Sequence, residues 1–398
     1  MYASSGAGIT SYLYGPFLHQ YIFHCLAQVS IVSYSSPQQS NLPISYDFST
    51  KMPSNTAAWL TAAQATPLEV KEAPYTSPGE NEILIKNGGI AINPVDWAVQ
   101  ARGDTLFPWA QYPTILGTDV AGEVVEVGSG VTRFKVGDRV LGMATGFRPD
   151  SANSERAFQA YTKLQSNMAA QIPSALSYES ACVIPMGISV GACGLFEKDM
   201  LALEYPTVKP TPKGKTVLIW GGSTSMGCNA IQLAVSAGYE VLSTSSPKNF
   251  DLIKKLGASQ VFDYNSPNII NELIEAFKGK TCAGAVAIGN AVTMFSGVAE
   301  ACIEVVSKVD GTKFVALTMP VPKDVLAGVE AKFILGQSLK DNDLGKIIYE
   351  DFLPEALANG QFVAAPEPIV VGKGLEYLQE ALDVQKKGVS AKKVVVSL

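Results

Sequence analysis

The stretch Thr216-Val-Leu-Ile-Trp-Gly-Gly-Ser-Thr-Ser-Met-Gly227 decides the fold, because an apolar run leads straight into glycines and hydroxyl residues before a helical pattern begins. At such a loop, bare backbone N–H groups and the positive end of the helix dipole can face a pyrophosphate. Thr224 stands where the usual middle glycine would be, and a tight strand-to-helix turn is the alternative interpretation. We predict that the loop binds a dinucleotide through Gly222, Ser223, Thr224, Ser225 and Met226.

The segments around this loop alternate between short apolar runs and longer helical patterns. We expect strands at 216–220, 240–244, 260–264, 284–288 and 313–317, with helices at 226–237, 249–256, 269–277 and 292–305. Continuous apolar strands separated by helices indicate a parallel sheet that is covered on both faces. The expected fold class here is therefore α/β, with a doubly wound Rossmann domain.

A different pattern precedes this domain. Residues 68–141 read as short strands separated by Gly/Pro turns, which indicates a compact and mainly β domain. A helix is expected to begin at Ser177, a good N-cap with Glu179 in the first turn, and to run towards Leu195. Near the end of the chain, the Val-rich strand Lys393–Ser397 suits a return into the sheet of the mainly β domain.

Composition excludes several classes of protein. The 398 residues are 47% hydrophobic, and 30 Lys plus Arg stand against 36 Asp plus Glu, a net charge of −6. Without a basic cluster we expect no nucleic-acid partner. The dinucleotide loop leads us to expect a small-molecule substrate. The six cysteines form no CxxC pair, and the only histidines, His19 and His24, have no neighbours that complete a metal set. Scattered thiols indicate a reducing compartment, so we expect a cytoplasmic protein.

The first fifty residues differ from the rest of the chain, because they contain no Lys or Arg and a single acid, Asp47. They lack the basic start of a secretory signal, and their apolar run is broken by polar residues and Pro16, so they make neither a good signal nor a spanning helix. We therefore expect no membrane partner and predict that residues 1–51 are a peripheral or disordered extension.

The end of the second Rossmann strand predicts which nicotinamide cofactor is used. NAD-preferring sites present Asp or Glu to the ribose about 20 residues past the glycine loop. Here the segment Ser243-Thr-Ser-Ser-Pro-Lys-Asn249 has no acid and offers a cation with several hydroxyl and amide donors. Such donors favour the 2′-phosphate of NADP over a neutral hydroxyl. The alternative is a helix cap beside a solvated Lys248.

Four segments, in order, resemble the medium-chain dehydrogenase/reductase superfamily: Asn93-Pro-Val-Asp-Trp97, Leu116-Gly-Thr-Asp-Val-Ala-Gly122, Val127-Gly128 through Gly137-Asp-Arg-Val140, and the Gly221 loop. Residues 245–251 and 261–264 are similar to its fungal branch of quinone-oxidoreductase-like proteins and stand-alone enoyl reductases of polyketide pathways. This resemblance covers about residues 52–398. It implies a GroES-like catalytic domain at 52–178 and 322–398 and a Rossmann NADP-binding domain at 179–321. The superfamily commonly forms homodimers, so a homodimer is an expectation.

The departures from the superfamily concern zinc. Where its zinc alcohol dehydrogenases carry a ligand Cys and a ligand His, this chain has Asn93 and Thr118, and the four-cysteine structural lobe is missing. We therefore expect no metal site. Zinc cannot then polarise an alcohol oxygen, which disfavours classical alcohol dehydrogenation.

The resemblance also assigns roles by position. It places Val95, Asp96 and Trp97 beside the nicotinamide, Ser223 to Met226 at the phosphates, Ser246, Lys248 and Asn249 at the 2′-phosphate, Tyr264 at the adenosine, and Leu317 with Thr318 at the nicotinamide end. Val190 is the expected substrate-facing position, where some members carry Thr.

Several of these positions have ordinary alternatives. Asp96 can serve as a turn former, Tyr264 as a strand-end aromatic that packs on the sheet, and Trp97 as a core residue. No tyrosine matches the family's proton donor near residues 103–105, so the catalytic acid stays unassigned and solvent is a proton source.

These observations lead to three hypotheses. The first is an NADPH-dependent, zinc-independent reductase of an activated double bond, as in an enoyl or enone substrate, or of a quinone. The second is a carbonyl reductase or alcohol dehydrogenase of the same superfamily. The third is a non-catalytic NADPH-binding protein, which the missing acid favours.

Overall fold

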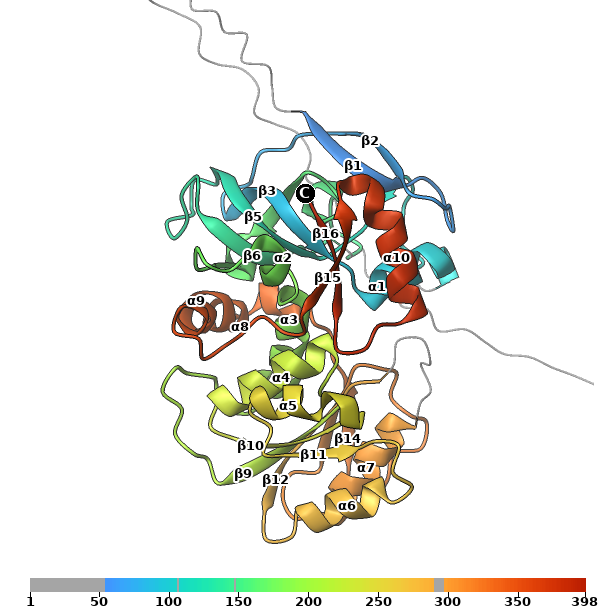
Figure 1. The fold of residues 1–398 in the computed structure, drawn as a ribbon, viewed down its shortest axis with the longest axis vertical. Helices are drawn as coiled ribbons and strands as arrows, with labels where there is room; N and C mark the ends of the chain where they lie inside the picture. Colours follow the sequence, from blue (N-terminus) through green and yellow to red (C-terminus); the bar gives the residue numbers. More distant parts are fainter. Residues whose placement is uncertain (1–53, 106, 147, 290–296) are drawn as a thin grey trace, which may run out of the picture. The chain divides into compact units, whose positions relative to one another are not determined.

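The structure is a computed structural model that describes residues 54–398 apart from 106, 147 and 290–296 (Figure 1). The chain divides into two units, Met1–Lys51 and Met52–Leu398, and the described residues belong to the second. The predicted N-terminal extension and the first part of the predicted helix at 292–305 lie outside the described residues.

The predicted mainly β domain is confirmed. Its strands are β1 (Asn55–Leu60), β2 (Glu69–Ala73), β3 (Glu82–Ala91), β4 (Thr114–Ile115), β5 (Asp119–Val127), β6 (Arg139–Met143), β7 (Tyr161–Gln165), β8 (Ala169–Gln171), β15 (Pro368–Lys373) and β16 (Lys393–Ser397). A seven-stranded sheet has the order β15-β16-β3-β5-β6-β8 with β7 also on β3, and a three-stranded sheet has the order β2-β1-β4. Helices α1 (Pro94–Arg102) and α10 (Leu378–Lys387) pack against each other beside these sheets (Figure 1).

The last strand returns to the first domain, as the sequence predicts. β16 pairs antiparallel with β3, with Val395 opposite Ala91, and parallel with β15. Val394, Val395 and Val396 are all fully buried. A run buried on both faces explains why this strand shows no alternation of polar and apolar residues.

The Rossmann domain is also confirmed. Its strands are β9 (Lys215–Trp220), β10 (Glu240–Ser245), β11 (Gln260–Asp263), β12 (Thr281–Ala287), β13 (Phe314–Leu317) and β14 (Glu330–Phe333). All pairs are parallel, in the order β11-β10-β9-β12-β13-β14, which is the doubly wound order of dinucleotide-binding folds. Its helices include α4 (Ser225–Ser236), α5 (Phe250–Lys255), α6 (Ile269–Ala276) and α7 (Val298–Lys308).

The sheet extends further along the chain than predicted. β14 is the sixth strand, and it carries the Rossmann sheet past the predicted domain end at residue 321. β14 is an edge strand whose sequence, Glu-Ala-Lys-Phe, contains two charged residues and none of whose side chains is fully buried. Such a strand has no apolar run, so the sequence pattern did not reveal it. The predicted domain start at residue 179 stays a prediction.

The helix predicted from Ser177 to Leu195 is two helices. The Ser177 hydroxyl accepts from the Ser180 N–H and caps α2 (Tyr178–Ala181), as predicted, and α3 (Pro185–Phe196) follows. Pro185 lacks the N–H that a continuous helix would use, so it begins α3 instead. The run from Tyr178 to Phe196 is long and apolar enough to cross a membrane, but 78% of it is buried inside the fold. It is therefore built like a core helix.

Short helices of the C-terminal tail hold the start of α3. They are α8 (Asp343–Lys346), a π-helical turn (Ile347–Phe352) and α9 (Leu353–Ala358). The buried Tyr349 hydroxyl donates to the Pro185 carbonyl over 2.9 Å. Arg133 in turn donates to the Tyr349 carbonyl over 3.0 Å, so the tail is tied to both α3 and the catalytic domain.

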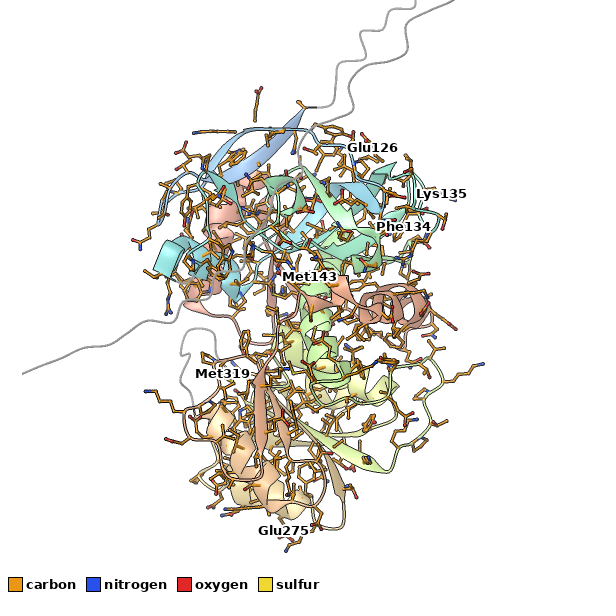
Figure 2. All side chains as sticks on the ribbon, turned by 180° about the vertical axis from the view of Figure 1, so that it is seen from behind. Glu126, Phe134, Lys135, Met143, Glu275 and Met319 are labelled. Carbon is orange, nitrogen blue, oxygen red and sulfur yellow. The ribbon has the colours of Figure 1, made fainter. Side chains whose placement is uncertain are left out.

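Side chains cover the faces of the sheets, as the view from behind shows (Figure 2). Met143, at the end of β6, and Met319, just after β13, are buried, whereas Lys135 and Glu275 are exposed at the periphery. The cysteines at 182, 193, 228 and 302 are all buried and free, so they serve as packing residues.

Candidate functional site

The glycine-rich loop joins β9 to α4, as predicted, but Thr224 has a role that the sequence left open. Its hydroxyl accepts from the Gly227 N–H over 2.9 Å and donates to the Gly221 carbonyl over 2.8 Å. Thr224 is thus the N-cap of α4, and both functions of its hydroxyl are used within the loop. Because its hydrogen is engaged with the Gly221 carbonyl, this side chain has none left for the predicted contact with a phosphate.

Two glycines of the loop cannot be replaced without strain. Gly221 has a φ of +84°, and a Cβ on Gly227 would lie 2.3 Å from the Gly221 carbonyl oxygen. The first turn of α4 therefore sits directly on the loop. The N–H groups of Ser225 and Met226 belong to that first turn, where no carbonyl four residues earlier lies within the helix. These groups suit a phosphate.

The other hydroxyl groups in and beside the loop differ in how far hydrogen bonds within the fold engage them. Ser245, at the end of β10, donates to the Ser223 hydroxyl over 3.0 Å, and the Gly221 N–H donates to the Thr244 hydroxyl over 3.1 Å. Ser225 donates to the Val183 carbonyl over 3.3 Å, just before α3. Ser223 is therefore the hydroxyl that remains best suited to a phosphate oxygen.

At the carboxyl ends of β10 and β11 the structure brings together two predicted residues. The hydroxyls of Ser246 and Tyr264 lie 2.8 Å apart. Tyr264 is 43% exposed, so it does not pack on the sheet as its alternative interpretation required. Lys248 is exposed beside them, and the acid of the next strand end, Asp263, accepts from the Asn265 backbone and side chain over 3.0 and 2.9 Å.

Ser390, which the sequence did not suggest, lies near the same carboxyl ends of the Rossmann strands. The Asn249 side chain donates to the Ser390 hydroxyl over 3.3 Å. Ser390 follows α10 and precedes β16, 141 residues further along the chain. Its hydroxyl can join the donors that the sequence predicts for a 2′-phosphate. Such a contact arises only from the tertiary fold, and no local pattern announces it.

At the predicted nicotinamide end, Leu317 and Thr318 close β13. The Leu317 side chain is fully buried in the core of the Rossmann domain, so only its backbone can face a cofactor. The Thr318 N–H donates to the Ala287 carbonyl over 3.1 Å, and its hydroxyl accepts from the Gly289 N–H over 3.4 Å. Thr318 thus joins the ends of two neighbouring strands.

The three predicted residues of α1 take different roles. The Asp96 carboxylate accepts from the Asn93 N–H over 2.7 Å and so helps to cap α1, a role that differs from the turn former of its alternative interpretation. Burial raises the pKa of Asp96 to about 7, although the backbone hydrogen bond from Asn93 lowers it. Trp97 is 8% exposed within the core of the catalytic domain, and among the described residues its indole N–H has no partner. Val95 is half-buried at the edge of that core.

The residues at the superfamily's zinc-ligand positions form a different kind of centre. The Asn93 amide donates to the Thr118 hydroxyl over 3.0 Å and to the Asp119 carboxylate over 2.9 Å. The Lys393 ammonium donates to the Asn93 carbonyl oxygen over 2.6 Å and to the same Asp119 oxygen over 2.9 Å. The side chains of Lys393 and Asp119 are only 4% and 0% exposed, so a buried ion pair occupies this place.

These residues do not fit a zinc ion. The Asn93 side-chain oxygen already accepts from a positive charge that would repel a metal ion, and its nitrogen is a donor and offers a metal no lone pair. Burial raises the pKa of the nearby Cys182 thiol, which disfavours the thiolate that zinc requires. Among the described residues, no group of three or more His, Cys, Asp or Glu side chains could hold a metal ion.

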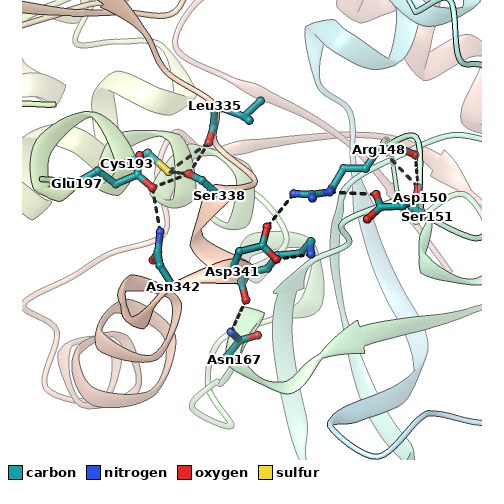
Figure 3. A network of polar contacts seen from close by, with 11 residues as sticks. Arg148, Asp150, Ser151, Asn167, Cys193, Glu197, Leu335, Ser338, Asp341 and Asn342 are labelled. Carbon is teal, nitrogen blue, oxygen red and sulfur yellow. Dashed lines mark hydrogen bonds and ion pairs between the residues drawn. The ribbon is translucent and has the colours of Figure 1, made fainter. Parts of the chain in front are cut away.

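Val190, the predicted substrate position, is half-buried on α3 and packs against a segment of the tail. A Cβ on Gly336 would lie 2.4 Å from the Val190 side chain. Figure 3 shows how the adjoining segment is held: Ser338 donates to Glu197 over 2.6 Å and lies 3.2 Å from the Cys193 sulfur, and Asp341 pairs with Arg148 over 3.0 Å. The segment that packs against Val190 is therefore held by contacts to α3 and to Arg148 of the catalytic domain.

Sequence reasoning missed Asp119 and Lys393 as well as Ser390. A signal for the first two exists, because each is a charged residue at the start of an apolar strand. A charge buried in such a strand requires a partner, so the two residues could have been paired on that ground.

Comparison with protein families and relatives agrees with this architecture. The Alcohol dehydrogenase GroES-like domain family matches residues 79–174. Dehydrogenase pigH of Monascus ruber is 52% identical over 376 residues, which cover 87% of this chain and all of that protein. The zinc-binding alcohol dehydrogenase domain-containing protein cipB of Emericella nidulans is 50% identical, covering 86% and 98%. Trans-enoyl reductase himH of Aspergillus japonicus is 38% identical, covering 86% and 97%.

Solved structures share the fold at lower identity. CurK enoyl reductase has a TM-score of 0.67 at 17% identity, covering 86% of this chain and 99% of that one. The quinone oxidoreductase of Pseudomonas syringae pv. Tomato DC3000 has a TM-score of 0.65 at 21% identity, covering 86% and 100%. At such identities the likeness concerns the fold alone.

Proposed function

The chain belongs to the medium-chain dehydrogenase/reductase superfamily of oxidoreductases, and we propose that it is an NADPH-dependent, zinc-independent reductase. Its acceptor is an activated carbon–carbon double bond, as in an enoyl or enone substrate, or a quinone. One observation carries the proposal: the Lys393 ammonium lies 2.6 Å from the oxygen of Asn93, at the superfamily's zinc-ligand position.

The choice of acceptor follows from that buried cation. An alcohol must lose a proton as it loses hydride, and zinc assists this step by polarising the oxygen. With an ammonium in that place, the favoured acceptor is one whose carbon is already electrophilic. Enones, enoyl thioesters and quinones meet this condition, because a conjugated carbonyl withdraws electron density from the carbon that accepts hydride.

The choice of NADPH rests on the donors beyond β10. Ser246, Lys248, Asn249 and Tyr264 offer hydroxyl, ammonium and amide donors, and residues 243–249 contain no carboxylate. A dianionic 2′-phosphate gains charge-assisted hydrogen bonds there, whereas the free hydroxyls of NAD lack the acceptor that they prefer.

The residues of the chain then have the following tasks. Bound NADPH supplies a hydride at its nicotinamide ring. Ser223 and the first-turn N–H groups of α4 hold the phosphates, while Val95 and Thr318 border the nicotinamide end. Holding the two reactants in register supplies much of the rate enhancement in such transfers. The proton that completes the reduction comes from solvent.

The test is NADPH oxidation by the purified protein with one enone, one enoyl thioester, one quinone and one aldehyde, each with and without a zinc chelator. Saturable turnover with any of the first three, unaffected by the chelator, is expected. Turnover with the aldehyde alone would instead identify a carbonyl reductase. Tight NADPH binding without turnover on any acceptor would identify a binding protein.

A further inference from the structure

We propose that the buried Lys393 ammonium is a positioning residue for hydride transfer, because it ties the beginnings of α1, β5 and α3 together at one point. This inference rests on the proposed function, since it requires that the chain transfer hydride from NADPH. It assigns a role to a lysine of the last strand, which no motif of the glycine loop or of the 2′-phosphate end includes.

The contacts of Lys393 reach two elements that lie far away in the sequence. Asn93, 300 residues earlier, is the N-cap of α1, the helix that carries Val95, Asp96 and Trp97. Asp119, 274 residues earlier, is the first residue of β5. A single ammonium thus fixes the start of the helix expected at the nicotinamide to the sheet of the catalytic domain.

Asp119 carries the connection onward to the Rossmann side of the site. Its second carboxylate oxygen accepts from the Met186 N–H over 2.7 Å, in the first turn of α3. A negative charge is favoured at that helix end because the N–H groups and the helix dipole both face it. Lys393 therefore also orients the carboxylate that accepts from the first turn of α3.

The beginning of α3 is packed without space against the phosphate loop helix. A Cβ on Gly187 would lie 2.9 Å from the Ser225 carbonyl oxygen and 2.5 Å from the Asn229 side chain of α4. Ser225 donates to the Val183 carbonyl over 3.3 Å. A continuous series of contacts therefore leads from Lys393 through Asp119 and Met186 to the first turn of α4.

A buried ion pair is weak evidence for stability, because well-packed apolar residues can stabilise a core equally well. Lys393 and Asp119 instead supply directional contacts. They make four hydrogen bonds, 2.6 to 2.9 Å long, that hold the first residues of α1, β5 and α3 in place. In hydride transfer, a misplacement of about 1 Å between the reacting groups can cost on the order of a hundredfold in rate.

The test compares Lys393→Met, which removes the charge but keeps the length, with Lys393→Arg, which keeps the charge. Lys392→Met is the matched control, because Lys392 is the preceding residue, is partly exposed and pairs with Glu367. We expect Lys393→Met to lower kcat by at least about tenfold while the Kd for NADPH stays within about threefold of wild type. With NADPH deuterated at the transferred position, the isotope effect on kcat should rise, because hydride transfer becomes slower than product release.

Lys393→Arg should recover part of kcat, and Lys392→Met should leave all three quantities unchanged. A folded Lys393→Met protein with wild-type kcat and isotope effect would overturn the inference. So would a variant that only melts at a lower temperature and keeps wild-type kcat well below its Tm, since that is a merely structural role.

If Lys393→Met does not fold, the double variant Lys393→Met/Asp119→Leu leaves no charge unpaired in the core. It should fold, bind NADPH and remain slow, and wild-type kcat in this variant would overturn the inference. A different observation would contradict the proposed function, namely that wild type itself oxidises no NADPH with any acceptor. The inference about Lys393 would then be wrong as well.

Discussion

Ser246 and Tyr264 lie 18 residues apart in the sequence, yet their hydroxyls share a 2.8 Å hydrogen bond just beyond the ends of two neighbouring parallel strands. The carboxyl ends of such strands are where doubly wound folds bind their ligands. The pair is exposed and joins no core cluster among the described residues. We therefore expect it to affect the affinity for the cofactor more than the stability of the fold.

Replacing Tyr264 with Phe removes this hydrogen bond and leaves the ring in place. A hydrogen bond of this kind contributes about 0.5–1.5 kcal/mol, so NADPH affinity should fall roughly two- to tenfold. The Tm of the free protein should not change, because Tyr264 is 43% exposed. Fluorescence titration with NADPH and a melting curve measure the two quantities. A lower Tm with unchanged affinity would assign the pair to the fold.

Lys248→Ala tests the choice between the two cofactors. A hydrogen bond to a charged group contributes about 1.5–3 kcal/mol, and solvent screening at the exposed Lys248 favours the lower figure. NADPH affinity should therefore fall about tenfold, whereas NADH affinity should barely change. Lys255→Ala is the control, since Lys255 is exposed at the other end of the adjoining helix α5. Equal losses for both cofactors, or a wild type that prefers NADH, would show that Lys248 is only a solvated residue.

Asp96 should make stability depend on pH in an unusual direction. Burial raises its pKa from 3.8 to about 7, so the folded state takes up a proton at a pH where the unfolded state stays ionised. The free energy of unfolding therefore gains a contribution as the pH falls from about 7 towards about 4, and loses it as the pH rises through about 7.

Asp96→Asn is neutral at every pH and lacks this contribution. We therefore compare the free energy of unfolding of Asp96→Asn minus that of wild type. This difference should be larger at about pH 8.5 than at about pH 5, by about 3 kcal/mol at most. Denaturant unfolding of both proteins at the two pH values measures the difference. Parallel curves with no relative change would show that Asp96 stays ionised in the fold.

The ion pair at the zinc-ligand positions predicts that the purified protein holds no stoichiometric zinc and that a chelator leaves both Tm and NADPH turnover unchanged. The reason is the Lys393 ammonium, 2.6 Å from the Asn93 oxygen, which repels a divalent cation. Elemental analysis of the protein before and after dialysis is the measurement. One tightly held zinc per chain would contradict this interpretation.

Local sequence patterns predicted most of the fold. Apolar runs and glycine turns predicted the glycine loop, five of the strands that build the Rossmann sheet, the Ser177 cap and the return of Lys393–Ser397 into the catalytic sheet. Each of these depends on residues close in the sequence. The helix break at Pro185 was also visible there, but the apolar run on both sides of it obscured the signal.

The parts that escaped prediction depend on contacts between distant segments. Ser390 reaches Asn249 across 141 residues, and Lys393 reaches Asp119 across 274. Thr224 was predicted at the phosphate, but its role as the cap of α4 depends on the orientation of one hydroxyl. The edge strand β14 has charged residues because its outer side has no partner strand among the described residues, and this removed the apolar signal.

The most direct test of reduction by NADPH traces deuterium from NADPH labelled at the transferred position, using chelator-treated protein with an enone, an enoyl thioester or a quinone. We expect at least one of these acceptors to consume the cofactor, and the reduced enone or thioester to carry one deuterium on the carbon β to the carbonyl, as mass spectrometry would show. If none of the three acceptors consumes NADPH, or if only an aldehyde does so, the chain is not a reductase of this kind.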